Sequence, residues 1–275
     1  MNSLRPMLLL ALGSALLVGG LSESASIERT SGRQIDMDCR DSGRATAGPY
    51  LVENNTWGSA GVRGPYRQCA GIGPVQQDGS VSARWTWQWP AGPSEIKAFP
   101  QLIYGQKPGL APTPGTNLPM RTNDISVARS QWSTTSTFTG TGQLTFDLWL
   151  TKDAVKRDCF NCTPITHEIM IVFEPYGGYG LRRNPAWYQG EVTIDKYKYK
   201  LYKAENFGTT GWRFIVLQSL ETRKAGDIDL KAVLVLLKQR ALISGSEYLS
   251  SVEFGSEPEE GTGDVLVNSF KVDVR

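Results

Sequence analysis

The chain has few metal-binding residue types and no large excess of charge of either sign. Among its 275 residues there is one histidine, His167, and there are four cysteines. A zinc site built on the CFNC stretch at 159–162 would therefore lack further ligands. The formal net charge is only +2, which argues against strong electrostatic binding to nucleic acid or to a membrane surface.

Long hydrophobic runs are also missing, apart from one near the start. Residues 7–21 form an apolar run that is too short for a comfortable membrane span, with Arg5 before it and small residues after it. This pattern is typical of a secretory signal peptide, and we expect residues 1–24 to be removed by cleavage near Ser24. The alternative is an uncleaved anchor. Once the signal peptide has been removed, we expect the mature protein to be extracellular or periplasmic and not to associate with a membrane.

The cysteines fall into two pairs, Cys39 with Cys69 and Cys159 with Cys162. In an exported chain the default expectation is two disulfides. A redox role for CFNC would need a thioredoxin-like strand–helix–strand context, and the sequence shows no such alternation. Half of a zinc site is the third interpretation of CFNC.

Short strand-like segments and turn residues dominate the chain. Residues 25–46 are polar and aperiodic, which predicts a short linker, and residues 47–275 show neither an internal repeat nor a second block of different composition. Segments such as SARWTWQW, LTFDLWL and HEIMIVF have strand patterns. One helix is predicted in DIDLKAVLVLLKQRALISG, with Asp227 as its N-cap. Many strands with a single helix predict an all-β antiparallel sandwich with one helix packed outside.

Strand periodicity assigns side chains to faces. In HEIMIVF, His167, Ile169, Ile171 and Phe173 point one way and form the packed face. Glu168, Met170 and Val172 point the other way, so the only histidine is expected to be buried or at an edge, aimed away from Glu168.

Two further strands place a carboxylate on the non-packed face. In LTFDLWL, Asp147 and Trp149 share it. In EYLSSVEFGSE the apolar set is Tyr248, Val252 and Phe254, while Leu249, Glu253 and Glu257 fall on the other side. Carboxylates among aromatics on one face of a sandwich are typical of sugar-cleaving sites, because aromatic rings stack on sugars and paired carboxylates cleave the bonds between them.

The order of these motifs resembles glycoside hydrolase family 12, a family of secreted endo-β-1,4-glucanases. The resemblance covers about residues 50–275, and it is carried by ENNTWG, WQW followed by IKAFP, FDLWL, HEIMIVF, GEVTIDKYKYKLY and VEFGSEPEEGTGDV. It implies a two-sheet jelly roll with a concave substrate cleft and a retaining mechanism that needs no metal or organic cofactor. It also implies that the Cys39–Cys69 pair is the family's N-terminal disulfide.

The resemblance assigns roles to residues of this chain. Glu168 corresponds to the nucleophile, Glu257 to the general acid/base, and Asp147 to the aspartate that hydrogen-bonds the nucleophile. The residues that match cleft-lining positions are Asn55, Trp57, Trp89 and Met170.

The sequence departs from the family pattern at two places near the cleft. Val172 stands where the family usually has a tryptophan, which would remove a stacking surface and make room for xylosyl branches. The turn after the nucleophile strand reads GGYGLRRNPAW in place of one with Pro-Ile-Gly. Of the two interpretations of Arg182 and Arg183, solubilising this loop is favoured over bordering the cleft.

Alternative functions remain open at this point. A carbohydrate-binding jelly roll without catalysis would share the strands and aromatics, but would not need both glutamates. KYKYKLYK at 196–203 could be a basic-aromatic nucleic-acid strip, but its alternation is that of a strand with a solvated lysine face. We therefore expect a monomer that acts on a β-glucan polysaccharide, with cellulose, mixed-linkage glucan and xyloglucan as the possible substrates.

Overall fold

The computed structural model describes residues 35–92, 95–154, 159–179 and 183–275, so the predicted signal peptide lies outside it. The strands and helices are β1 (Arg44–Ala47), β2 (Tyr50–Asn55), η1 (Ser59–Gly61), β3 (Arg67–Val75), β4 (Val81–Trp89), β5 (Phe99–Gly105), β6 (Met120–Arg121), β7 (Ala128–Phe138), β8 (Thr141–Thr151), β9 (Ile165–Tyr176), η3 (Pro185–Trp187), β10 (Tyr188–Ile194), β11 (Tyr197–Phe207), β12 (Trp212–Ser219), β13 (Ala225–Asp229), α1 (Leu230–Gln239) and β14 (Tyr248–Val274).

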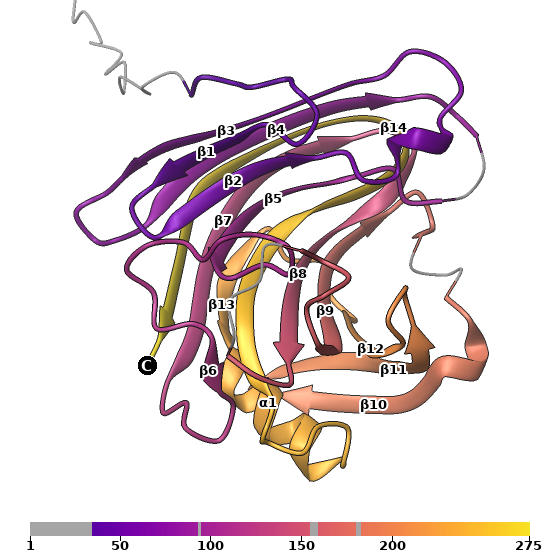
Figure 1. Ribbon diagram of the computed structural model, residues 1–275. Coiled ribbons are helices and arrows are strands. Elements are labelled where there is room, and N and C mark those ends of the chain that lie inside the picture. Colours follow the sequence, from indigo (N-terminus) through magenta and orange to yellow (C-terminus); the bar gives the residue numbers. More distant parts are fainter. Residues whose placement is uncertain (1–34, 93–94, 155–158, 180–182) are drawn as a thin grey trace, which may run out of the picture. The chain divides into compact units, whose positions relative to one another are not determined.

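The strands form two sheets stacked face to face (Figure 1). The front sheet has the order β1-β2-β5-β14-β8-β9-β12-β11-β10, with β6 also paired to β14. The back sheet has the order β3-β4-β14-β7-β13. The predicted jelly-roll sandwich is confirmed. Pairing is antiparallel among the described strands except between β9 and β12, which are parallel because the chain passes through β10 and β11 before it returns.

Strand β14 belongs to both sheets. Its first half, up to Glu260, pairs with front-sheet strands, and its second half, from Gly261, pairs with β4 and β7 of the back sheet. Gly261 has a φ of +91°, and a Cβ atom there would lie 2.2 Å from the Thr139 carbonyl oxygen. Only glycine fits where the strand changes sheets.

Aromatic side chains fill the space between the sheets. Trp132 of the back sheet stacks on Phe173 and meets Phe146 edge to face, with ring centroids 4.5 and 5.4 Å away. Each such buried side chain contributes roughly 1.5–3 kcal/mol. His167 also faces this side, as predicted: it is 7 % exposed, and its Nε2–H donates to the Leu242 carbonyl at 2.9 Å.

The single described α-helix starts two residues later than predicted. Asp229 is the N-cap, and its side chain accepts a hydrogen bond from the Ala232 amide at 2.9 Å. Asp227, the predicted cap, instead lies in β13, because that strand runs directly into the helix. The buried positions match the predicted apolar stripe and are Leu230, Val233, Leu234 and Leu237. No helix of the described residues is long and apolar enough to cross a membrane.

The N-terminal part of the domain joins the sandwich earlier than the predicted boundary at residue 47. Arg44–Ala47 forms β1, although the pattern had placed it in the linker 25–46, and the predicted Cys39–Cys69 disulfide is present. The second predicted disulfide is not formed, because Cys159 and Cys162 are both exposed thiols.

Candidate active site

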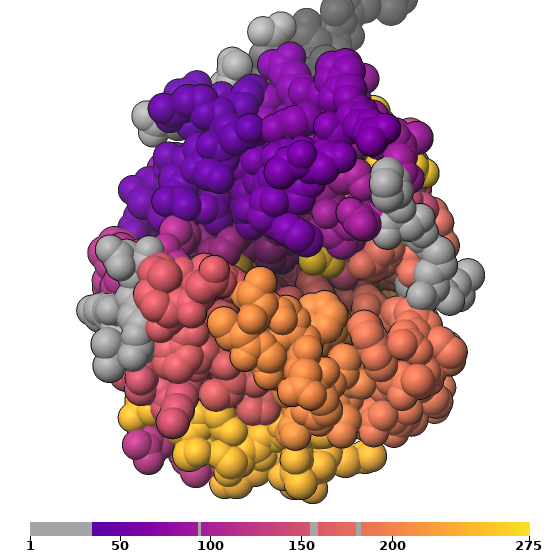
Figure 2. All heavy atoms as spheres, turned by 45° about the vertical axis from the view of Figure 1, so that its right-hand side comes forward, coloured from indigo at the N-terminus to yellow at the C-terminus, as the bar shows by residue number. Residues whose placement is uncertain are grey.

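A cavity of about 1170 Å³ lies on the concave face of the front sheet. Strands β8, β9, β12 and β14 contribute its floor, and loops that include residues 107–110, 160–161 and 208–209 contribute to its walls. In the space-filling view a hollow separates the N-terminal strands from the segment near residues 200–210 (Figure 2). The cavity slightly exceeds the usual range of small-molecule pockets, about 300–1,000 Å³, so its size suits an extended ligand.

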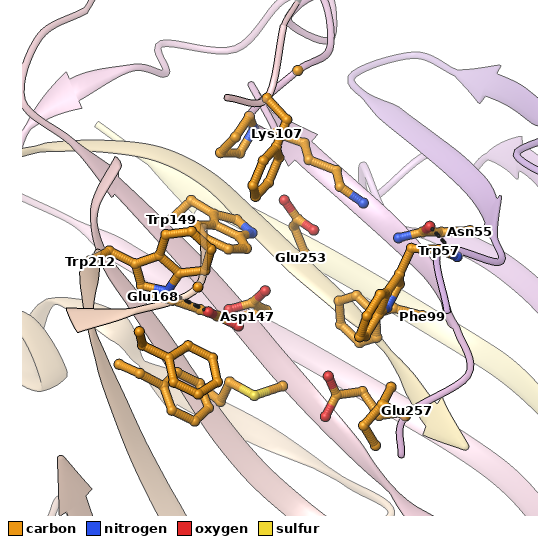
Figure 3. A pocket seen from close by; sticks show the side chains of 18 of the residues that line it. Asn55, Trp57, Phe99, Lys107, Asp147, Trp149, Glu168, Trp212, Glu253 and Glu257 are labelled. Carbon is orange, nitrogen blue, oxygen red and sulfur yellow. Dashed lines mark hydrogen bonds between the residues drawn. The ribbon is translucent and has the colours of Figure 1, made fainter. Parts of the chain in front are cut away.

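The strand register gathers acidic side chains on the floor of this cavity. Glu253 on β14 lies opposite Asp147 on β8, and Glu257 lies opposite Gln143. Glu168 projects from the neighbouring strand β9, and all of these residues line the cavity. Figure 3 shows the carboxyl groups of Asp147 and Glu168 side by side, with Glu257 on the other side of the floor. The predicted faces of Asp147, Glu168 and Glu257 are thus confirmed.

The parity prediction fails at the beginning of β14. Leu249, assigned to the cleft face, is fully buried in the core, while Tyr248 lies outside the core cluster and contacts Arg121. The cause is a bulge between Leu249 and Ser251, where the extra residue reverses the alternation. From Val252 onward the alternation again matches the prediction.

Glu168 has one specific hydrogen-bond donor. Trp212 on β12 donates its indole N–H to Glu168 Oε2 at 2.7 Å, and Trp212 itself packs edge to face on Trp149. Burial, and next the charge of Glu257, raises the pKa of Glu168 to about 8, while the indole donor opposes the shift. The donor therefore stabilises the ionised form of a carboxyl group that burial makes reluctant to ionise.

Asp147 is the most strongly perturbed of these acids. It is 3 % exposed, and its Oδ1 has no hydrogen-bond partner among the described residues. Burial, followed by the charges of Glu168 and Glu253, raises its pKa well above the ordinary value. Burial therefore favours the protonated form of Asp147, and a protonated carboxyl beside Glu168 can donate to it.

Glu257 is held from the side by an amide. Gln143 Nε2 donates to Glu257 Oε2 at 2.5 Å. Burial raises the pKa of Glu257 to about 7, although the Gln143 hydrogen bond and the nearby Arg183 charge both lower it. Because burial raises the pKa of Glu168 and Glu257 alike, these shifts alone do not assign the proton. The indole donor and a protonated Asp147 favour the negative charge on Glu168.

Glu253 is a fourth carboxyl in the site, and the sequence analysis did not select it. It is fully buried, Ser251 Oγ donates to its Oε1 at 2.8 Å, and its Oε2 has no partner among the described residues. Burial raises its pKa to about 7. The sequence did place Glu253 on the same strand face as Glu257, and this could have identified it.

Glu53 on β2 is another acid that sequence reasoning missed, and it lies in an ion pair. Arg44 and Lys107 bind its two oxygens at 2.6 and 2.8 Å, and Gln101 donates to it at 3.2 Å. Although burial acts in the opposite direction, these cations hold the pKa of Glu53 below its ordinary value. It is therefore an ionised wall residue with no proton to give near neutral pH.

The predicted substrate-binding residues divide into two groups. Asn55, Trp57 and Met170 line the cavity, and Trp57 is 62 % exposed, with its ring facing the hollow (Figure 3). Trp89 does not line it. That side chain is 2 % exposed and stacks on Tyr66 within the core, so the predicted contact with substrate is wrong for Trp89.

The departures from the family pattern also have different structural outcomes from those predicted. Val172 is fully buried, packs in one cluster with Met170 and Phe214, and is not among the cavity-lining residues. Arg183, predicted to solubilise a loop, lines the cavity and reaches Gln143 and Gln218. Arg182 lies outside the described residues.

Aromatic residues missed by the sequence analysis cover the floor around Glu168. On one side Phe160 packs edge to face on Trp149 and Trp212. On the other, Phe207 stacks on Phe214 with centroids 4.4 Å apart. Phe160 comes from the CFNC loop, which therefore contributes an aromatic side chain to the cavity wall.

Comparison with known proteins finds one family. Residues 48–275 match the model described as Glycosyl hydrolase family 12. A xyloglucan-specific endo-beta-1,4-glucanase A of Emericella nidulans is 28 % identical over 94 % of this chain and 98 % of its own length. Endoglucanase S of Pectobacterium parmentieri is 25 % identical, with 82 % of each chain covered.

A solved structure and an inactive relative complete the comparison. The family 12 xyloglucanase from Bacillus licheniformis superimposes with a TM-score of 0.75 at 25 % identity, covering 87 % of this chain and all of that one. A protein of Phytophthora nicotianae named as an inactive glycoside hydrolase is 25 % identical over 83 % of this chain and 87 % of its own length. Similarity to the family therefore does not by itself establish activity, which depends on the residues of the site.

Proposed function

The chain belongs to glycosyl hydrolase family 12, and on that premise we propose that it cleaves internal β-1,4-glucosidic bonds of cellulose and related β-glucans with retention of configuration. One observation carries the proposal: Glu168 and Glu257 project into a single cavity from different strands, and their surroundings differ. A retaining pair needs one ionised and one protonated carboxyl about 5–5.5 Å apart.

In the proposed reaction Glu168 attacks C1 of the sugar while Glu257 gives its proton to the departing glycosidic oxygen. The bond from C1 to that oxygen breaks as a covalent glycosyl-enzyme forms. Glu257, now ionised, removes a proton from water, and the water oxygen attacks C1 and releases Glu168. Asp147 supports the nucleophile by donating its proton toward Glu168.

Substrate binding is proposed for the aromatic and polar side chains along the cavity. The exposed face of Trp57 offers a stacking surface for a sugar ring, and Asn55 beside it offers a polar contact. Met170, next to Glu168 on the same strand face, supplies an apolar floor under the reacting sugar.

The proposal is tested by the release of reducing ends and the loss of viscosity from soluble β-1,4-glucan. An endo-acting enzyme lowers viscosity early, before many reducing ends appear. Binding of the polymer with no release of reducing ends would instead identify a carbohydrate-binding module. A glycosyl azide formed by azide rescue of Glu168→Gly must have the α-configuration, and a β-configured product would contradict the nucleophile assignment.

Xyloglucan is the second candidate substrate, because the Emericella nidulans and Bacillus licheniformis relatives are both named for it. Initial rates on cellulose, mixed-linkage glucan and xyloglucan, measured side by side, decide between the candidates.

Export and the monomeric state are also proposals. The hydrophobic run at 7–21 with its basic start supports export with removal of residues 1–24. N-terminal sequencing of the exported protein and its mass in solution test both points.

A further inference from the structure

A chain of three polar side chains leads from the cavity wall to Glu257. Arg183 Nη2 donates to Gln143 Oε1 at 2.6 Å, and Gln143 Nε2 donates to Glu257 Oε2 at 2.5 Å. Neither Gln143 nor Arg183 belongs to the motifs that carry the resemblance to the family. Arg183 lies in the turn where this chain departs from that pattern.

The arginine fixes the orientation of the amide. A guanidinium group only donates hydrogen bonds, so the Gln143 atom that it contacts must be the carbonyl oxygen. The amide nitrogen is thereby directed at Glu257, and it also lies 4.0 Å from the Met170 sulfur. Gln143 is fully buried, so a flipped amide would place two donors against each other with no water to relieve them.

Arg183 is itself held in place. Its Nε donates to Gln218 Oε1 on β12 at 2.9 Å, and its guanidinium lies over the rings of Tyr179 and Tyr202, at 5.7 and 5.8 Å. A planar fork that contacts two amides at once is pre-organised in a way that a lysine is not.

We infer that Arg183 is a positioning residue for the acid/base: by locking the Gln143 amide, it makes Glu257 Oε2 the acceptor and leaves the transferable proton on Oε1. Without the arginine, Gln143 can turn its carbonyl toward Glu257 and accept that proton, so the acid is held in an unproductive hydrogen bond. The inference rests on the proposed function, because it requires Glu257 to act as the acid.

The charge of Arg183 and the amide orientation act in the same direction on acidity. Burial raises the pKa of Glu257, and both the Gln143 donor and the Arg183 charge lower it. The active form of the acid is protonated, so activity falls as pH rises through this pKa. Loss of Arg183 must therefore move the alkaline limb of the pH–rate profile to higher pH, while turnover falls at pH values below the pKa of Glu257, where the acid is protonated in both proteins.

The test compares Arg183→Met with wild type on aryl β-cellotriosides that carry a good (dinitrophenolate) or a poor (phenolate) leaving group. We expect kcat/KM on the poor leaving group to fall about 10-fold, since about 1.4 kcal/mol of hydrogen bonding to a charged group is lost. The loss on the good leaving group should be less than about threefold, and the alkaline limb should rise by about one pH unit. Equal losses on both substrates with an unmoved limb would overturn the inference.

Three further variants make the result specific. Arg84→Met is the matched control, because Arg84 pairs with Asp264 on the back sheet away from the cavity. The alkaline limb of the pH–rate profile of this variant must stay where it is in wild type. Gln143→Leu removes the donor to Glu257 Oε2 and must also move the alkaline limb to higher pH. On the poor leaving group the double variant must be no worse than Gln143→Leu alone. Additive losses would mean that Arg183 does not act through the amide. Arg183→Lys keeps the positive charge but lacks the planar guanidinium that contacts both amides. If this variant behaves like wild type, Arg183 does not act by fixing the orientation of the Gln143 amide. This variant still tests the inference if Arg183→Met fails to fold.

Glu257→Ala, measured alongside, separates this inference from the proposed function. A loss that does not depend on the leaving group in Glu257→Ala would remove Glu257 as the acid, and with it the proposed function. A strong leaving-group dependence in Glu257→Ala with none in Arg183→Met would overturn the role of Arg183 alone.

Discussion

Glu53 and Glu253 are almost equally buried on the same face of the front sheet, but their electrostatic surroundings are opposite. Glu53 is 3 % exposed and Glu253 is 0 % exposed. Arg44 and Lys107 bind Glu53 directly, and its pKa is lowered. Glu253 has no such direct ion pair among the described residues; Ser251 donates a hydrogen bond to it, and burial raises its pKa to about 7 although the nearby Lys107 charge opposes this shift.

The difference indicates which acids take part in proton chemistry. A buried carboxylate that is neutralised by cations stays ionised and serves as structure. Asp147, Glu168 and Glu253 form no direct ion pair with another described residue, and burial raises the pKa of each. Stability is sacrificed at this part of the floor, and perturbed acids gathered in a cavity are typical of a catalytic site.

The largest expected effect is that of Glu168→Gln. An amide cannot attack C1, so kcat should fall by about 10⁴-fold or more while the affinity for β-glucan is kept. Initial rates and binding isotherms on the same polymer measure the two quantities. Residual activity above about one per cent, which is far more than loss of a nucleophile leaves, would exclude Glu168 as the nucleophile.

Glu253→Gln should stabilise the protein only at alkaline pH. Because the folded pKa of Glu253, about 7, lies above its ordinary value of 4.5, the stability it contributes is complete below pH 4.5 and is lost as pH rises through 7. Glutamine does not ionise, so above pH 8 the variant should gain on the order of 3 kcal/mol in unfolding free energy, and nothing at pH 4. Denaturant unfolding at both pH values checks this, and an equal gain at pH 4 would remove ionisation as the cause.

The variants Asp147→Leu and Asp147→Asn test whether Asp147 acts on Glu168 as a hydrogen-bond donor or as a negative charge. Leucine removes the donor beside Glu168 and should lower kcat by about 10- to 100-fold through misplacement of the nucleophile. Asparagine keeps a donor and should retain most of the activity at pH 5, because burial raises the pKa of Asp147 well above its ordinary value and favours the protonated carboxyl. If both variants lose activity equally at pH 5, Asp147 does not act as a donor.

Lys107→Met has the smallest expected effect, and it brings Glu53 closer to the situation of Glu253. Stability that depends on the lowered pKa of Glu53 is present above pH 4.5 and is lost as pH falls through the folded pKa. Arg44 remains as a partner, so at pH 7 the variant should lose only about 1 kcal/mol. The loss of unfolding free energy should vanish at pH 3. Denaturant unfolding curves at pH 7 and pH 3 measure it, and a loss of equal size at pH 3 would contradict the prediction.

The sequence predicted those parts of the site that depend on strand alternation. Period two placed Asp147, Glu168 and Glu257 on one face, because each lies in a regular strand. It failed for Leu249 because a bulge adds a residue, which no local pattern reveals. Alternation along its strand shows on which face Trp89 lies, but it does not show that Tyr66 stacks on the ring and covers it in the folded chain.

Contacts between distant segments could not be predicted from the pattern. Arg183 and Gln143 lie 40 residues apart, and nothing local indicates that one amide joins the arginine to Glu257. The CFNC pair was expected to form a disulfide because the chain was expected to be exported. The structure has two exposed thiols there, and the same loop places Phe160 against two tryptophans.

Since β14 passes from one sheet to the other at Gly261, Glu257 is anchored only four positions before the start of the back-sheet segment. Substitutions far from any sugar, such as those that loosen the packing of Val265 or Val267, can then displace the acid through the strand itself. Selection for heat tolerance in the back sheet of this enzyme would accordingly change turnover and melting temperature together.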